Sequence, residues 1–211
     1  MAITTQQIKE LREATGAGVL DCRKALEQAE GDYSKAVDIL REKGLAKAAK
    51  RSDREASEGV VELYSHGNGR IGVMVEVNSE TDFVARSQAF REFAHEVALQ
   101  VAAGAAQYIK TEQVPAAVIE HERDIARGRA REEGKPEQVI ERIAEGRVEK
   151  FLDEVCLLRQ PYIRDESIQF EKLLHEKIIA LGENIVIRRI ARWQLGEAVS
   201  AAAPTAPDMK S

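Results

Sequence analysis

The sequence predicts an α+β protein: an N-terminal three-helix module followed by a helix-rich core with a small antiparallel three-stranded sheet. Composition gives the first indication, because 44% hydrophobic and 32% charged residues with only 5% aromatics are typical of a helix-rich chain that still buries a core. The second is a change in apolar spacing, from helical in residues 1–46 to strand-like after residue 59. We therefore divide the chain into the module (1–46), a linker (47–58), an α+β core (59–197) and a disordered tail (198–211).

Residues 1–46 read as three short helices. Thr4 or Thr5 caps the first helix, which the segment 15–18 interrupts, and the second starts near Val19. The third ends at Gly44, because glycine commonly terminates helices. Their inner faces carry small and apolar side chains: Ile8, Leu11, Cys22, Ala25, Leu26, Ala29, Ala36, Val37 and Leu40. So small a bundle has a thin core, which suits a docking module better than a catalytic domain.

Basic residues alternate with alanines and serines in the linker 47–58. We interpret this segment mainly as a solvated helical tail that connects the module to the core. The alternative is a basic strip that reaches an acidic partner or RNA. The net charge of −5 disfavours RNA, and it argues against a direct nucleic-acid partner for the chain as a whole.

A β-hairpin is predicted where Asn68-Gly69 separates two apolar runs, since this dipeptide favours the tight turns that join antiparallel strands. The first run covers 60–64 and the second 71–77. The glycines around the turn also spell G-x-G-x-x-G. That dinucleotide fingerprint requires a helix next, whereas here it leads into a strand, so we expect no dinucleotide site.

The segment 81–84 (TDFV) follows the second strand and admits two structures. An unbroken helix would place Phe83 at heptad spacing with Phe90 and bury it, and periodicity alone favours this alternative. Otherwise Ser87 caps a new helix, and the segment becomes a short separate turn from which Phe83 projects. Asp82 suits the first turn of a helix, because unpaired N–H groups there favour a carboxylate. The function depends on which structure forms.

Three further helices and a closing strand complete the core. The helices are predicted at 115–134, 136–158 and 168–181, where prolines open the first two and Gly182 ends the third. The β-branched run 185–193 is long enough to pair with the hairpin as a third strand. Its arginines either bind an anion or, as is more common, protect a sheet edge from aggregation: Arg188, Arg189 and Arg192.

Residues 1–211 carry no recognisable catalytic motif. The four histidines fall on different predicted elements, and a metal site needs convergent ligands. Cys22 and Cys156 read as minor core residues that fit a reducing cytoplasm. No apolar run approaches the ~20 residues of a membrane span, and the N-terminus lacks the features of a signal peptide. We therefore expect a cytoplasmic protein with no membrane partner that is not an enzyme, without catalytic residues, metal or cofactor.

Several motifs in a fixed order resemble the bacterial elongation factor Ts family. Residues 11–26 (LREATGAGVLDCRKAL) are similar to the opening of that family, and residues 77–86, which contain TDFV, to its second signature. Further pieces match in the same order: Gly134-Lys135-Pro136, Glu145-Gly146-Arg147, Gln160-Pro161-Tyr162 and the segment 182–189. The resemblance covers nearly the whole chain except its C-terminal end.

The resemblance implies a guanine-nucleotide exchange factor for the translational GTPase elongation factor Tu, which promotes GDP release during translation elongation. It also implies that the N-terminal module is ubiquitin-associated-like and docks on the GTPase domain through Arg12, Val19 and Leu20. Many relatives carry methionines where this chain has Val19 and Leu20. The contact with the partner therefore stays apolar, although the shapes of the side chains that make it differ.

The second signature is implied to act at the partner's nucleotide site. Thr81, Asp82, Phe83 and Val84 match the segment whose acid and aromatic ring intrude beside that site and displace its Mg²⁺. This role requires an exposed Phe83, so the resemblance favours the alternative in which Ser87 breaks the helix.

Longer family members duplicate the core and insert a long coiled coil, whereas this chain shows one hairpin and one closing strand. It therefore resembles the short form, in which two chains supply the two halves, so we expect a homodimer in which 59–197 is also the dimerisation domain. One competing interpretation is a ubiquitin-associated-like adaptor without exchange activity. Another is an enzyme that uses pairs such as His121-Glu122, but nothing orders such groups into a site.

Overall fold

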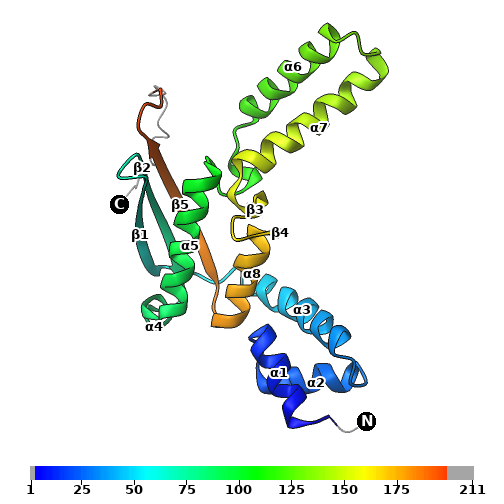
Figure 1. The fold of residues 1–211 in the computed structure, drawn as a ribbon, viewed down its shortest axis with the longest axis vertical. Helices are drawn as coiled ribbons and strands as arrows, with labels where there is room; N and C mark the ends of the chain where they lie inside the picture. The colour runs from blue at the N-terminus through cyan, green and yellow to red at the C-terminus, as the bar shows by residue number, and fades with distance from the viewer. Residues whose placement is uncertain (1–2, 199–211) are drawn as a thin grey trace.

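The computed structural model describes residues 3–198, without the side chains at positions 45 and 47–49. Within that range the chain forms an α+β fold, as predicted, with helices in the N-terminal module and a three-stranded antiparallel sheet in the core (Figure 1). The predicted disordered tail lies outside the described residues from position 199 onward.

Three helices form the N-terminal module: α1 (Thr5–Thr15), α2 (Val19–Gln28) and α3 (Tyr33–Ala49). Thr4 caps α1 by accepting a hydrogen bond from the backbone N–H of Gln7, whose side chain binds back to Thr4 in a capping box. Gly16 ends α1 in the left-handed region at φ 66°. The module has its own small core of buried residues: Leu11, Cys22, Ala25, Leu26, Ala29, Ala36 and Leu40.

The prediction that the third helix ends at Gly44 is wrong, because α3 continues through this residue to Ala49. Gly44 is buried where α3 meets α8 (Phe170–Leu181), and a β-carbon at this position would lie 2.4 Å from Cδ1 of Ile179. The missing side chain therefore permits a close helix–helix approach instead of terminating the helix. The first part of the predicted linker is accordingly helical.

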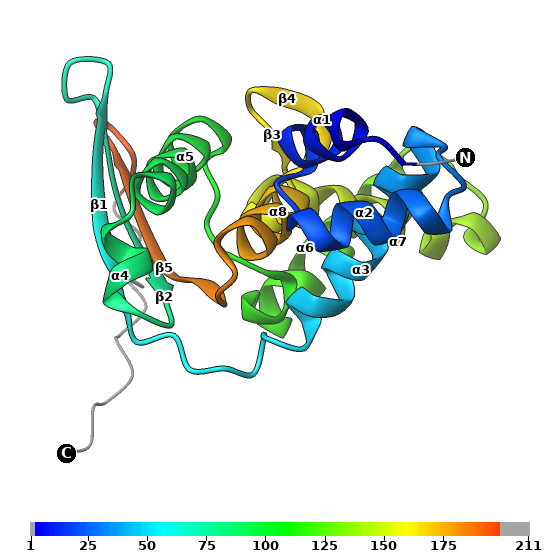
Figure 2. The ribbon, with the colours of Figure 1, turned by 90° about the horizontal axis from the view of Figure 1, so that it is seen from below.

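The sheet has the strand order β1-β2-β5 and is antiparallel throughout. Its strands are β1 (Glu58–His66), β2 (Ile71–Ser79) and β5 (Ile185–Gln194). Asn68 and Gly69 both have positive φ in the turn between β1 and β2, which confirms the predicted hairpin. The helix α5 (Gln88–Gly104) lies across one face of this sheet (Figures 1 and 2).

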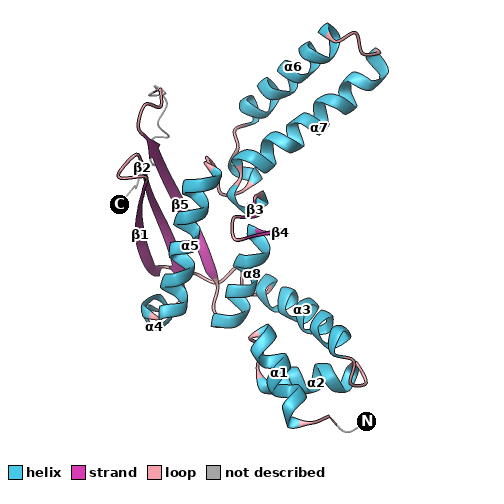
Figure 3. Ribbon diagram, in the orientation of Figure 1, coloured by secondary structure: helices cyan, strands magenta, loops and turns pink. Residues whose placement is uncertain are grey.

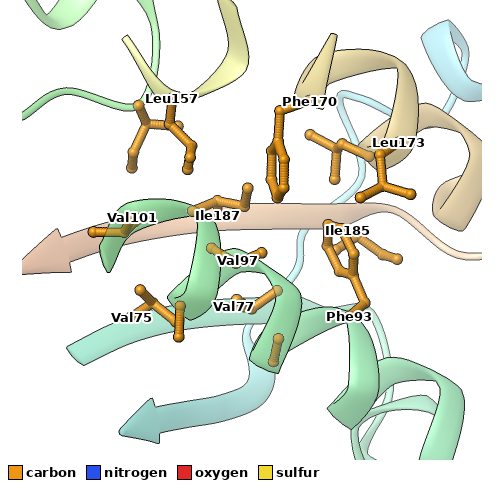
Figure 4. Packing of buried hydrophobic residues seen from close by; sticks show 14 of the residues in the cluster. Val75, Val77, Phe93, Val97, Val101, Leu157, Phe170, Leu173, Ile185 and Ile187 are labelled. Carbon is orange, nitrogen blue, oxygen red and sulfur yellow. The ribbon is translucent and has the colours of Figure 1, made fainter. Parts of the chain in front are cut away.

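The main hydrophobic core fills the space between that sheet face, α5 and α8 (Figure 4). Phe93 of α5 stacks on Phe170 of α8 with 6.3 Å between ring centroids, and both rings are fully buried. Val75 and Val77 of β2 and Ile187 of β5 belong to the same cluster. This core therefore joins α5, α8 and the central part of the sheet into one unit.

Two long helices, α6 (Ala116–Glu132) and α7 (Glu137–Val155), pack as an antiparallel hairpin that projects from the core (Figure 3). They begin after Pro115 and Pro136 as predicted. Ion pairs between the helices include Arg127 with Glu141 at 2.9 Å. The sequence did not predict this projection, because the spacing of apolar residues along one helix does not show which other helix it packs against.

The segment after α7 differs from the prediction. α7 ends at Val155, and a short helix η2 (Leu157–Arg159) follows. The strands β3 (Pro161–Tyr162) and β4 (Asp165–Gln169) then form a small ribbon, so α8 begins at Phe170 instead of Ile168. Asp165, the first residue of β4, accepts hydrogen bonds from the backbone N–H and the hydroxyl of Ser167 in the same strand. A second short helix, η1 (Thr111–Gln113), precedes α6.

We expect Gly44→Leu to lower the free energy of unfolding by about 1–3 kcal/mol, because the new side chain must displace Ile179 from the α3–α8 contact. Gly128→Leu is the matched control: no atom lies within 4 Å of a β-carbon at Gly128 on α6, and leucine favours helix more than glycine does. Urea denaturation of both variants checks this. Equal stabilities for the two variants would contradict the proposed role of Gly44.

Candidate functional site

The turn 81–86 projects Phe83 into solvent. It forms the short helix α4 (Asp82–Arg86), which Thr81 caps at its start and Ser87 ends in an extended conformation with ψ 145°. Ser87 then caps α5 by accepting a hydrogen bond from the N–H of Phe90 at 3.3 Å. Phe83 is 82% exposed, whereas Phe90 is fully buried. The broken-helix alternative is thus confirmed, and burial of Phe83 in one continuous helix is wrong, because the break at Ser87 removes Phe83 from the apolar stripe of α5.

The other residues of the TDFV segment differ in exposure. Thr81 and Asp82 are exposed beside Phe83, and Asp82 pairs with Arg86 at 3.0 Å on the outer side of α4. Val84 is only 7% exposed and packs into the main core. Val84 therefore anchors the turn, and the surface consists of the other three residues.

Glu183, which the sequence analysis did not single out, holds the start of this turn. One carboxylate oxygen accepts the backbone N–H of Thr81 at 3.0 Å, and the other accepts its hydroxyl at 2.6 Å. The same hydroxyl oxygen accepts the N–H of Val84 at 3.3 Å. Glu183 lies in the segment 182–189 that carries the family resemblance, but 102 positions separate it from Thr81, so only the fold reveals the contact.

A second set of hydrogen bonds ties the turn to the linker. The backbone N–H of Asn184 donates to Glu80 at 2.6 Å, and Arg54 pairs with the same carboxylate at 3.3 Å. The buried side chain of Asn184 donates to the backbone carbonyls of Ser52 and Arg54 at 3.3 and 2.8 Å. Donation by the Asn184 N–H, helped by the Arg54 guanidinium, lowers the pKa of Glu80 despite its partial burial. The end of the linker is therefore fixed beside the turn.

The second predicted contact surface lies on the N-terminal module. Val19 and Leu20 occupy the first turn of α2 and are 48% and 71% exposed. Arg12 is exposed on α1. The structure brings these three residues onto one module, but α2 and α4 lie well apart in both views (Figures 1 and 2). The site therefore consists of two separate surfaces.

Among residues 3–198, no group of three or more histidine, cysteine or carboxylate side chains is placed to hold a metal ion. Burial raises the pKa of both cysteine thiols, Cys22 and Cys156, which disfavours reactive thiolates. No helix of the described part of the chain is long and apolar enough to cross a membrane.

These features define a class: an α+β protein that presents exposed apolar side chains from two separate surfaces. Comparison with known proteins narrows the class. The family model described as Elongation factor TS matches residues 2–197. The chain is 57% identical over 198 residues to elongation factor Ts of Carboxydothermus hydrogenoformans, covering 94% of this chain and 91% of that relative. It is 58% identical over 197 residues to elongation factor Ts of Caldanaerobacter subterraneus subsp. tengcongensis, covering 93% and 98%. The chain belongs to the elongation factor Ts family.

The difference in exposure between two phenylalanines predicts very different losses of stability on substitution by alanine. We expect Phe83→Ala to change the free energy of unfolding by less than about 0.5 kcal/mol, since its ring makes little contact with the protein. Phe90→Ala leaves a cavity in the core and should lower the free energy of unfolding by about 3–5 kcal/mol. Chemical denaturation followed by circular dichroism measures both. A large loss of stability in Phe83→Ala would show that the ring is buried in solution.

Proposed function

We propose that this protein is a guanine-nucleotide exchange factor for elongation factor Tu, acting in the cytoplasm during translation elongation. The observation that carries the proposal is the 82% exposure of Phe83 on a turn fixed by hydrogen bonds. Hydration of an exposed phenylalanine ring is unfavourable, and transfer of the ring from water into a partner's pocket is therefore favourable. Membership in the elongation factor Ts family supports the choice of partner.

In this proposal the turn works as a wedge. Phe83 enters beside the nucleotide pocket of the GTPase while Asp82 brings negative charge next to its Mg²⁺ site, and Thr81 fixes the start of the turn. Mg²⁺ bridges the nucleotide phosphates to the protein, so distortion of its site weakens nucleotide binding. Exchange factor and GDP then oppose each other, each lowering the affinity of the GTPase for the other by the same factor. The factor changes no covalent bond and is not an enzyme in this role.

The N-terminal module supplies the docking contact. Val19 and Leu20 form an exposed apolar pair with Arg12 on the neighbouring helix, and this set suits an apolar contact with a polar margin on the GTPase domain. Because the pair lies apart from Phe83, docking and displacement are served by different surfaces. Nucleic acid and membrane are not partners in this proposal.

We also propose a homodimer formed through the sheet face that points away from α5. Leu63, Met74 and Ala191 lie opposite one another across the three strands of this face. Leu63 and Trp193 are 70% and 64% exposed, and Val61 and Met74 are exposed beside them. Exposed apolar side chains of one sheet face suit a second copy of the same face, since a two-fold axis pairs a patch with itself.

The adaptor interpretation remains the second candidate, and the separate hydrophobic core of the docking module favours it. The module has its own core and its own exposed apolar pair. A protein of that kind would bind through Val19 and Leu20 without changing nucleotide release, so an exchange assay separates the two functions.

Stopped-flow release of fluorescent GDP from elongation factor Tu tests the wedge. We expect Phe83→Ala to lower the limiting release rate by roughly 30- to 1000-fold, which corresponds to ~2–4 kcal/mol for loss of a buried aromatic anchor. Leu20→Ala should mainly raise the concentration needed for half the maximal rate, and Val139→Ala, an exposed apolar site on α7, should change neither. An unchanged limiting rate with Phe83→Ala would exclude the wedge.

Sedimentation equilibrium tests the dimer. The parent protein should have twice the mass of one chain, and Leu63→Glu should have the mass of one chain, because a two-fold interface would bury two unpaired carboxylates. Val139→Glu adds the same charge on α7 and should remain a dimer. A parent protein with the mass of one chain would refute this part of the proposal.

A further inference from the structure

The carboxylate of Glu183 contacts the wedge at Thr81, the residue that caps the start of its short helix. Thr81 is the N-cap of α4, and a helix of five residues has almost no stability of its own in water. The direction of Phe83 therefore depends on how firmly Thr81 is held.

The hydrogen bonds of Thr81 leave it one arrangement. Its hydroxyl has a single proton, and a carboxylate oxygen 2.6 Å away can only accept it, so this proton points to Glu183. The lone pairs of the hydroxyl oxygen then face the N–H of Val84, which is the capping bond of α4. The other carboxylate oxygen holds the backbone N–H of Thr81 at 3.0 Å. Ser79 adds a hydrogen bond from its hydroxyl to the Thr81 carbonyl at 3.0 Å.

Glu183 can hold the turn because its own backbone is fixed on both sides. Gly182 ends α8 in the left-handed region at φ 77°, and its N–H donates to the Ile178 carbonyl at 3.0 Å. Asn184 on the other side is buried and bonded to Glu80 and to the linker carbonyls. Ile185, which follows, is in the main core.

We infer that Glu183 is a positioning residue for nucleotide exchange: its bidentate carboxylate holds Thr81 so that Phe83 is presented in its active orientation before the partner binds. This inference rests on the proposed exchange function. A preorganised wedge avoids the entropy cost of ordering the turn during displacement, so loss of Glu183 slows displacement while docking through α2 persists.

The test compares Glu183→Ala, Glu183→Gln and Thr81→Val with the parent protein, and uses Glu132→Ala, an exposed glutamate on α6, as the matched control. We expect Glu183→Ala to lower the limiting GDP-release rate by about tenfold, the scale of lost charge-assisted hydrogen bonds, with little change in the half-saturating concentration. Glu183→Gln retains one acceptor oxygen and should lie between the parent and the alanine variant. The double variant Thr81→Val with Glu183→Ala should lower the limiting GDP-release rate by less than the product of the two single fold-changes, because both substitutions remove the same hydrogen bonds.

Hydrogen–deuterium exchange of the free protein supplies a measurement independent of the partner. Peptides covering 80–86 should exchange faster in Glu183→Ala, while peptides from α5 should be unchanged. A Glu183→Ala variant with the parent's limiting rate, or with unchanged protection at 80–86, overturns the inference and leaves the exchange function standing. A parent protein that does not accelerate GDP release overturns the proposed function and, with it, the role of Glu183 in exchange.

Discussion

The structure depends on keeping one aromatic ring in water while the two residues that follow it belong to the core. Val84 and Ala85 are buried and Phe83 is not, and this is possible because α4 is separated from α5 at Ser87 and capped at Thr81. A single continuous helix would instead carry the ring into the sheet-facing stripe with Phe90. Two capping hydroxyls thus decide whether the chain has a wedge at all.

The scaffold beneath the wedge explains why so short a helix can be held in place. α4 follows directly from β2, the central strand of the sheet, and Val84 joins the same core as Phe93 and Phe170. The Glu80–Asn184 and Thr81–Glu183 bonds connect the end of β2 to the start of β5. Through Arg54 they also reach the linker, so the two proposed contact surfaces are built on one connected frame.

Much of the fold could be predicted from local signals, since turns and caps act over a few residues. The Asn68-Gly69 turn, the prolines before α6 and α7 and the Ser87 break all depend on near neighbours in the sequence. Gly44 was misread because its role is set by Ile179 across a helix–helix contact. Likewise Glu183 could not be assigned from the sequence, because its contact with Thr81 exists only in the folded chain. Periodicity alone also failed at Phe83, since a change of helix resets the phase of the pattern.

The proposed function requires that this protein expels GDP from a partner GTPase. Stopped-flow release of fluorescent GDP from elongation factor Tu, with Mg²⁺ present and with increasing amounts of this protein, tests it most directly. We expect a release rate that rises with the concentration of this protein and reaches a plateau. A release rate that stays at its spontaneous value, at concentrations where the two proteins form a complex, would contradict it.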